Sequence, residues 1–196
     1  MANWAYTSYV IEGKQESIDR IYNAIQNPIL EEGAGEGWEG GVLKALGIQW
    51  EPRTPEGKGY YMRGFIEPDT VSCGDDVLRF DAQEAWGVTD FYEVLEKNIP
   101  DIKVFYIVEE QGEEIFATND KEGKYFTTRY YADCCIDGNY HTDYFCDKEF
   151  MYEWLKDITD GRVKTMEDVE KFNGDYEDAC EEDENFIHIY EYKVVD

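Results

Sequence analysis

The chain has few basic residues, few histidines and no long hydrophobic run. Its 196 residues include 18 Lys and Arg against 45 Asp and Glu, which gives a formal net charge of −27. A charge of this sign repels nucleic acid and anionic membrane, and it raises the rate of encounter with basic partners. No apolar stretch approaches the roughly 20 residues of a membrane span. We therefore expect a cytoplasmic protein that binds neither a membrane nor nucleic acid directly.

Motifs of catalysis are also missing from the chain. It contains no GxSxG, no GxxxxGK[ST] and no HExxH sequence. The two histidines are His141 and His188, and the second stands between Ile187 and Ile189, where a structural histidine is more common than a base. Carboxylate pairs are too frequent here to single one out as glycosidase machinery. The sequence predicts no catalytic residue and a protein that is not an enzyme.

Cysteines are few, odd in number and irregularly spaced: Cys73, Cys134, Cys135, Cys146 and Cys180. We predict five unpaired thiols, because this spacing suits no disulfide framework. Cys134, Cys135, His141 and Cys146 could supply zinc ligands, but neighbouring residues on a strand point to opposite faces and the spacing is not that of zinc knuckles. The acidic strings at 133–138 and 157–161 do not fit the register of a calcium loop and are interpreted as turns. We predict no metal and no cofactor.

The chain is rich enough in apolar side chains to fold. Hydrophobic residues make up 42% and aromatic residues 16%, more than disordered acidic chains contain. Ile18, Ile21, Tyr22 and Ile25 follow the spacing of an amphipathic helix, and alternation at 102–110 predicts a central strand. The predicted elements of the first half are a strand at 4–11, a helix at 14–26, strands near 59–67 and 77–82, a helix from Thr89 to about 98 and a strand at 102–110. This βαββαβ order is typical of an antiparallel α+β, ferredoxin-like fold.

The second half of the sequence also contains patterns that are typical of strands and helices. Strands are expected at 114–118, 124–132, 140–146 and 186–195, with helices near 149–157 and after a capping box formed by Thr165 and Asp168. We expect a ferredoxin-like domain at 1–132 and an acidic extension at 133–196 packed on the same sheet. The predicted core includes Ile18, Ile21, Ile25, Phe91, Leu95, Val104 and Tyr106.

A family resemblance is carried by several short motifs. Asn3-Trp4, Leu78-Arg79-Phe80, Ala85-Trp86-Gly87 and Gly123-Lys124-Tyr125, with Pro100 between them, resemble the ferredoxin-like domain of YubB-type proteins, an uncharacterised family associated with phages and plasmids. The resemblance covers about the first 130 residues. It implies a ferredoxin-like fold and a bacterial host cell, and it supplies no catalytic residues.

The distribution of charge along the chain leads to a hypothesis about its function. Residues 133–196 hold 20 acids and 6 bases, so their net charge of −14 matches the −13 of the much longer segment 1–132. We expect this segment to occupy a basic surface of another protein, as a nucleic-acid mimic that inhibits a DNA- or RNA-binding defence protein. The predicted contact residues are Asp175, Glu177, Asp178, Glu181, Glu182, Asp183, Glu184, Tyr140 and Tyr144. Two alternatives stay open: the acidic run serves solubility alone, or the fold carries a small-ligand or enzymatic cleft.

Overall fold

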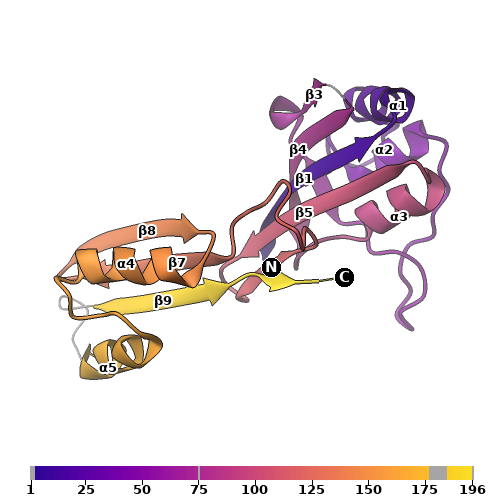
Figure 1. Ribbon diagram of the computed structural model, residues 1–196. Coiled ribbons are helices and arrows are strands. Elements are labelled where there is room, and N and C mark those ends of the chain that lie inside the picture. Colours follow the sequence, from indigo (N-terminus) through magenta and orange to yellow (C-terminus); the bar gives the residue numbers. More distant parts are fainter. Residues whose placement is uncertain (1–2, 75, 177–184, 196) are drawn as a thin grey trace. The chain divides into compact units, whose positions relative to one another are not determined.

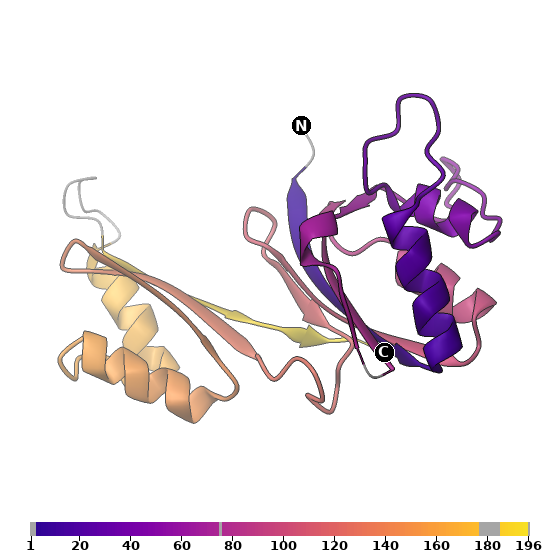
Figure 2. The same ribbon diagram turned by 90° about the horizontal axis from the view of Figure 1, so that it is seen from above.

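The computed structural model describes residues 3–74, 76–176 and 185–195 and is a mixed α+β protein with antiparallel sheets (Figures 1 and 2). It divides into two compact units, residues 1–120 and 121–195. The sequence placed the boundary after residue 132, which falls inside a strand of the second unit. None of the described helices is long and apolar enough to cross a membrane.

The first unit combines antiparallel strands with helices. Its elements are β1 (Trp4–Gly13), α1 (Gln15–Gln26), α2 (Glu39–Ala45), β2 (Gly64–Ile66), a 3-10 turn (Pro68–Thr70), β3 (Ser72–Gly74), β4 (Val77–Ala85), α3 (Phe91–Asn98), β5 (Ile102–Glu110) and β6 (Ile115–Thr118). The strands lie in the order β6-β5-β1-β4-β2, and β3 pairs with β4. Neighbouring strands are antiparallel, with Tyr9 opposite Phe80 on one side and Tyr106 on the other.

Apolar periodicity explains how this unit packs. The helices lie on one face of the sheet (Figure 2), and Ile18, Ile21 and Ile25 of α1 are buried, as the helical spacing predicted. The same holds for Phe91 and Leu95 of α3. Val104 and Tyr106 are buried too, and β5 has strands on both sides, which confirms that it is central. The predicted core of this unit is therefore correct.

Two local predictions in this unit were wrong. A strand was expected at 59–67, but only Gly64–Ile66 forms one. Residues 59–62 do not pair with the sheet, because Tyr60 forms a bridge with Pro52 instead. The N-cap residue of α3 is Asp90 and not Thr89. The Thr89 hydroxyl still accepts from the Phe91 amide at 3.3 Å, and it donates to the Glu39 carboxyl group at 2.8 Å.

The second unit forms a sheet of its own with two helices on one face. Its elements are β7 (Tyr130–Ile136), β8 (Asn139–Phe145), α4 (Lys148–Ile158), α5 (Met166–Tyr176) and β9 (Phe186–Glu191), and the two-residue strand β10 (Lys193–Val194) is not part of this sheet. The strand order is β8-β7-β9, with β7 antiparallel to both neighbours. The core between sheet and helices consists of Ala132, Cys134, Ile136, Phe145, Met151, Leu155, Val163, Val169, Phe172 and Ile187.

Local side-chain chemistry fixes the ends of these elements. The Asp147 carboxylate accepts from the Phe150 amide at the start of α4, and Thr165 accepts from the Asp168 amide, as the capping box predicted. Strands predicted at 124–132 and 140–146 lie at 130–136 and 139–145. The shift follows from the Asp137-Gly138 turn, where both residues have positive φ, the conformation that tight hairpins require.

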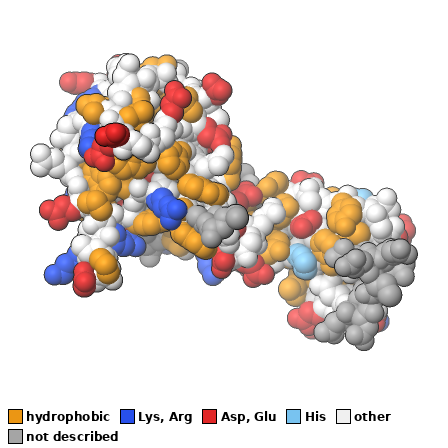
Figure 3. All heavy atoms as spheres, turned by 180° about the vertical axis from the view of Figure 1, so that it is seen from behind, with side chains coloured by type: hydrophobic (Ala, Val, Ile, Leu, Met, Phe, Trp, Pro, Cys, Tyr) orange, Lys and Arg blue, Asp and Glu red, His pale blue; other side chains and the backbone are white. Residues whose placement is uncertain are grey.

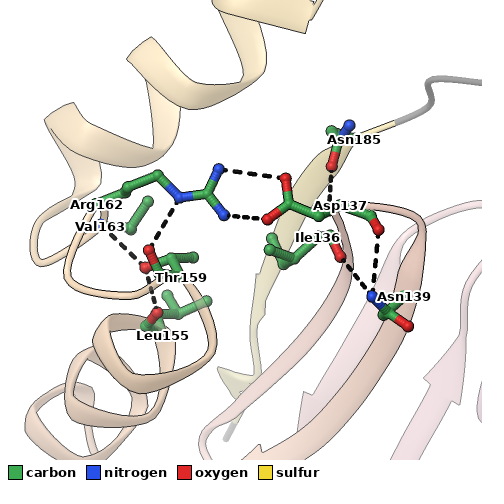
Figure 4. A network of polar contacts seen from close by, with 8 residues as sticks. All are labelled: Ile136, Asp137, Asn139, Leu155, Thr159, Arg162, Val163 and Asn185. Atoms are coloured by element: carbon green, nitrogen blue, oxygen red, sulfur yellow. Dashed lines mark hydrogen bonds and ion pairs between the residues drawn. The ribbon is translucent and has the colours of Figure 1, made fainter.

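A polar network ties this hairpin turn to the loop after α4 (Figure 4). The Arg162 guanidinium donates to both Asp137 carboxylate oxygens, at 2.6 and 3.4 Å, and its Nε donates to the Thr159 carbonyl at 2.9 Å. The Thr159 hydroxyl donates to the Leu155 carbonyl and accepts from the Val163 amide. These bonds join the hairpin turn to the C-terminal end of α4.

Candidate partner-binding face

The second sheet has an aromatic face on the side away from its helices. Side chains alternate along β7, so Ala132, Cys134 and Ile136 enter the core and the residues between them point the other way. We call this surface the open face. It consists of Tyr131, Asp133 and Cys135 of β7, Tyr140, Thr142 and Tyr144 of β8, and Phe186, His188 and Tyr190 of β9.

Strand register arranges the open face in three rows. Tyr131 lies between Tyr144 and Tyr190, and Cys135 lies between Tyr140 and Phe186. The middle row has Asp133 between Thr142 and His188. An aromatic row therefore stands on each side of a row that carries the carboxylate.

Ring contacts order the aromatic side chains of this face. The Tyr131 ring lies 4.9 Å from that of Tyr144 and 5.9 Å from that of Tyr190, measured between centroids. Phe186 stacks on the His188 ring at 4.6 Å, and Tyr140 meets Phe186 edge-on at 6.3 Å. Such pairs restrict side-chain rotation, so less rotational freedom is lost when a partner binds.

The edges of the open face are accessible. Tyr140 is 68% exposed and Tyr144 is 49% exposed, whereas Tyr131 is buried between its two neighbouring tyrosines. His188 is exposed on this face. Figure 3 shows hydrophobic side chains and a histidine on this side of the second unit. Large exposed aromatic side chains that are grouped in this way are typical of interaction surfaces.

Asp133 places a negative charge at the centre of the open face. Its side chain is half-buried on the central strand. Within the described part of the chain, its carboxylate has neither a hydrogen-bond donor nor a basic partner. A half-buried carboxylate between aromatic rows favours a cationic group that can contact both.

The predicted contact residues are divided between this face and the end of α5. Tyr140 and Tyr144 lie together on the open face, one in each aromatic row. Asp175 is exposed near the end of α5. The other six lie outside the described residues: Glu177, Asp178, Glu181, Glu182, Asp183 and Glu184.

The structure describes four of the five cysteines, and all four are free thiols. Cys134 and Cys135 are buried on opposite faces of β7, whereas Cys73 and Cys146 are exposed. Burial raises the pKa of the Cys134 thiol to about 12, with a smaller effect of the Asp133 charge. Among residues 3–74, 76–176 and 185–195, no cluster of His, Cys, Asp and Glu could hold a metal ion. Cys180 lies outside these residues.

Four members of this face were not predicted from the sequence: Asp133, Phe186, His188 and Tyr190. The signal was present in β9, where Phe186, His188 and Tyr190 alternate with Ile187 and Ile189. Alternation of this kind indicates that the two sets lie on opposite faces of a sheet. It does not say which face the helices cover.

A second concave feature lies in the first unit. Trp38, Trp50 and Tyr60 line a pocket of about 830 Å³ together with Glu31, Lys44 and Glu51. The two indole rings meet almost perpendicularly, with centroids 6.0 Å apart. Lys44 pairs with Glu31, and Glu51 forms no ion pair with any of the described residues.

No protein-family model, curated protein or solved structure matches this chain. The resemblance to YubB-type proteins therefore stays a prediction, and the function is argued from the geometry of the chain itself.

Proposed function

We propose that the protein binds an arginine-bearing basic surface of another protein through the open face, without chemistry of its own. The observation that carries the proposal is the Asp133 carboxylate, which has no partner among the described residues and lies between two aromatic rows whose outer rings Tyr140 and Tyr144 are exposed. Guanidinium groups stack on aromatic rings and form paired hydrogen bonds with carboxylates, so arginine matches both features. The net charge of −27 supports a basic partner and opposes a nucleic acid.

The proposed role is that of a nucleic-acid mimic. Proteins that bind DNA or RNA present arginine and lysine to phosphates, and an acidic protein can occupy the same surface. The acidic run at 175–184 would attract such a partner over a distance, and the open face would supply the close contacts. We further propose that residues 1–120 are a ferredoxin-like domain, which the order β5-β1-β4-β2 with α1 and α3 supports.

The test measures binding of a labelled oligo-arginine peptide by fluorescence anisotropy. Each of the two rings is expected to contribute about 0.5–1 kcal/mol to the binding free energy. The double variant Tyr140→Ala, Tyr144→Ala should therefore weaken binding by roughly five- to thirtyfold. Phe150→Ala is the matched control, because Phe150 is an aromatic residue of α4 that is 60% exposed.

Two further probes separate the alternatives. An oligo-lysine peptide should lose less affinity than oligo-arginine in the double variant, because lysine lacks the planar group. A single-stranded RNA of equal length should bind more weakly than either peptide. Equal loss in Phe150→Ala and the double variant, or tighter binding of the RNA, would contradict the proposal.

Small-ligand binding is a second candidate function, which the pocket of Trp38, Trp50 and Tyr60 favours. Its volume is within the usual range for ligand sites, and aromatic walls beside Glu51 suit a small organic cation. Choline and its uncharged carbon analogue are the probes. Choline should quench tryptophan fluorescence, and Trp50→Ala should remove this effect while Trp86→Ala, an exposed tryptophan outside the pocket lining, keeps it. Equal response to both probes would exclude a cation site.

A further inference from the structure

Two glutamates are buried together inside the first unit. Glu39, the first residue of α2, and Glu84 of β4 are both 0% exposed. None of the bases in the described residues forms an ion pair with either carboxyl group. Two ionised carboxylates in such a place would be uncompensated charges at close range, which proteins avoid.

Hydrogen bonds account for one oxygen of each carboxyl group. Glu84 Oε1 accepts from the Tyr9 hydroxyl at 2.8 Å and from the Thr89 amide at 2.9 Å. Glu39 Oε2 accepts from the Thr89 hydroxyl at 2.8 Å. The other two oxygens, Glu39 Oε1 and Glu84 Oε2, are buried and have no donor among the described residues. A proton on one carboxyl group would supply the donor that both oxygens lack.

The surrounding groups are consistent with a single proton. Burial raises the pKa of Glu39 well above its usual range, and the charge and hydrogen bond of Glu84 act in the same direction, whereas the Thr89 hydroxyl and the Gly64 amide have smaller, opposite effects. The titratable groups that face the pair are the phenols of Tyr9, Tyr61 and Tyr106, whose pKa values burial also raises. Arg63 interacts with Tyr61, and within the described residues it forms no ion pair with either carboxyl group.

We propose that Glu39 and Glu84 share one proton. This proton stabilises the packing of α2 on the sheet and is lost at alkaline pH. The pair joins segments from four parts of the first unit: β1, the start of α2, β4 and the residue before the N-cap of α3. Trp38, a wall of the ligand-sized pocket, directly precedes Glu39. Loss of the proton would therefore loosen α2 and the pocket wall together.

The pH dependence has a definite sign. The native state keeps a proton that an unfolded glutamate releases near its ordinary pKa of about 4.3. The contribution to stability is complete below that value and is lost as the pH rises toward the raised pKa of the folded state. One retained proton corresponds to a tenfold fall in the folding equilibrium constant for each pH unit over this range.

The variant Glu39→Gln tests the proposal, since its amide can donate to Glu84 at every pH. Urea unfolding between about pH 6 and pH 9, followed by tryptophan fluorescence, should show a shallower loss of stability in this variant than in the wild type. Glu36→Gln is the matched control, because Glu36 is exposed and its change removes the same charge. Equal pH slopes in Glu39→Gln and Glu36→Gln would overturn the proposal.

Infrared spectroscopy gives a second readout that does not depend on how the variant folds. Ordinary carboxyl groups are ionised at about pH 7. The wild type and Glu36→Gln should still show the band of a protonated carboxyl group at this pH. Absence of the band from the wild type would overturn the shared proton, whatever the behaviour of Glu39→Gln.

Discussion

Replacing Gly64 with alanine should destabilise the first unit severely. Gly64 lies opposite Glu84 in the sheet, and a Cβ atom on it would stand 2.3 Å from Glu39 Oε1 and 2.6 Å from Oε2. A carboxyl group at the end of a flexible side chain could ordinarily move away. Here it is fully buried and holds a hydrogen bond from Thr89, so the methyl group must displace it from its partner.

The expected loss combines two effects. Overpacking a filled site costs about 1–3 kcal/mol, and a buried polar group deprived of its partner costs about 1–3 kcal/mol more. We expect Gly64→Ala to lower the free energy of unfolding by about 3 kcal/mol, roughly a 150-fold change in the folding equilibrium constant. Urea unfolding followed by circular dichroism measures this change.

A matched control and a double-mutant cycle test the reasoning. Gly74→Ala should change stability by less than about 0.5 kcal/mol, because a Cβ atom there meets nothing within 4 Å. Glu39→Ala removes the group that the new methyl would strike, so adding Gly64→Ala to it should cost much less than in the wild type. Additive effects of the two changes would refute the proposed clash.

Three other predictions concern the second unit and the exposed thiols. Leu155→Ala should lower the stability of the second unit by about 2–5 kcal/mol, measured by hydrogen exchange, because Leu155 is fully buried in its core. A thiol reagent at about pH 8 should modify Cys73 and Cys146 well before Cys134, whose thiol is buried and has a raised pKa; equal rates would contradict the burial. Joint neutralisation of four acidic residues should slow association with oligo-arginine at low salt more than it speeds dissociation, and stopped flow measures both rates. An unchanged association rate would mean that this acidic segment only keeps the protein soluble. The four residues are Glu181, Glu182, Asp183 and Glu184.

Strong periodicity made much of the fold predictable. The spacing of Ile18, Ile21 and Ile25 and the alternation at 102–110 depend on local geometry, and both elements formed as expected. Asp137 and Gly138 were predicted to form a turn. The strand before them was placed too early in the sequence, because aromatic residues at 124–129 resemble a strand. The division between the two units was also placed late, because charge density changes gradually where the contacts change abruptly.

The site was less accessible to sequence reasoning. Tyr140 and Tyr144 were selected because they stand among acids, but Asp133 and His188 join them only through strand register. Glu39 and Glu84 are two among 45 acidic residues, and nothing local marks them as buried. Their pairing depends on the path of residues 27–62, a long connection whose route over the sheet has no periodic signal.

The two-residue turn at Asp137-Gly138 decides which chemistry the second sheet presents outward. Side chains in a strand alternate with a period of two, so one extra residue in this turn would shift β8 by one position against β7. Phe145 would then leave the core, and Tyr140 and Tyr144 would turn toward the helices. The Arg162 ion pair to Asp137 and the bond from the Asp137 amide to Asn185 oppose such a slip. This two-residue turn thus determines which side chains of β8 form the open face.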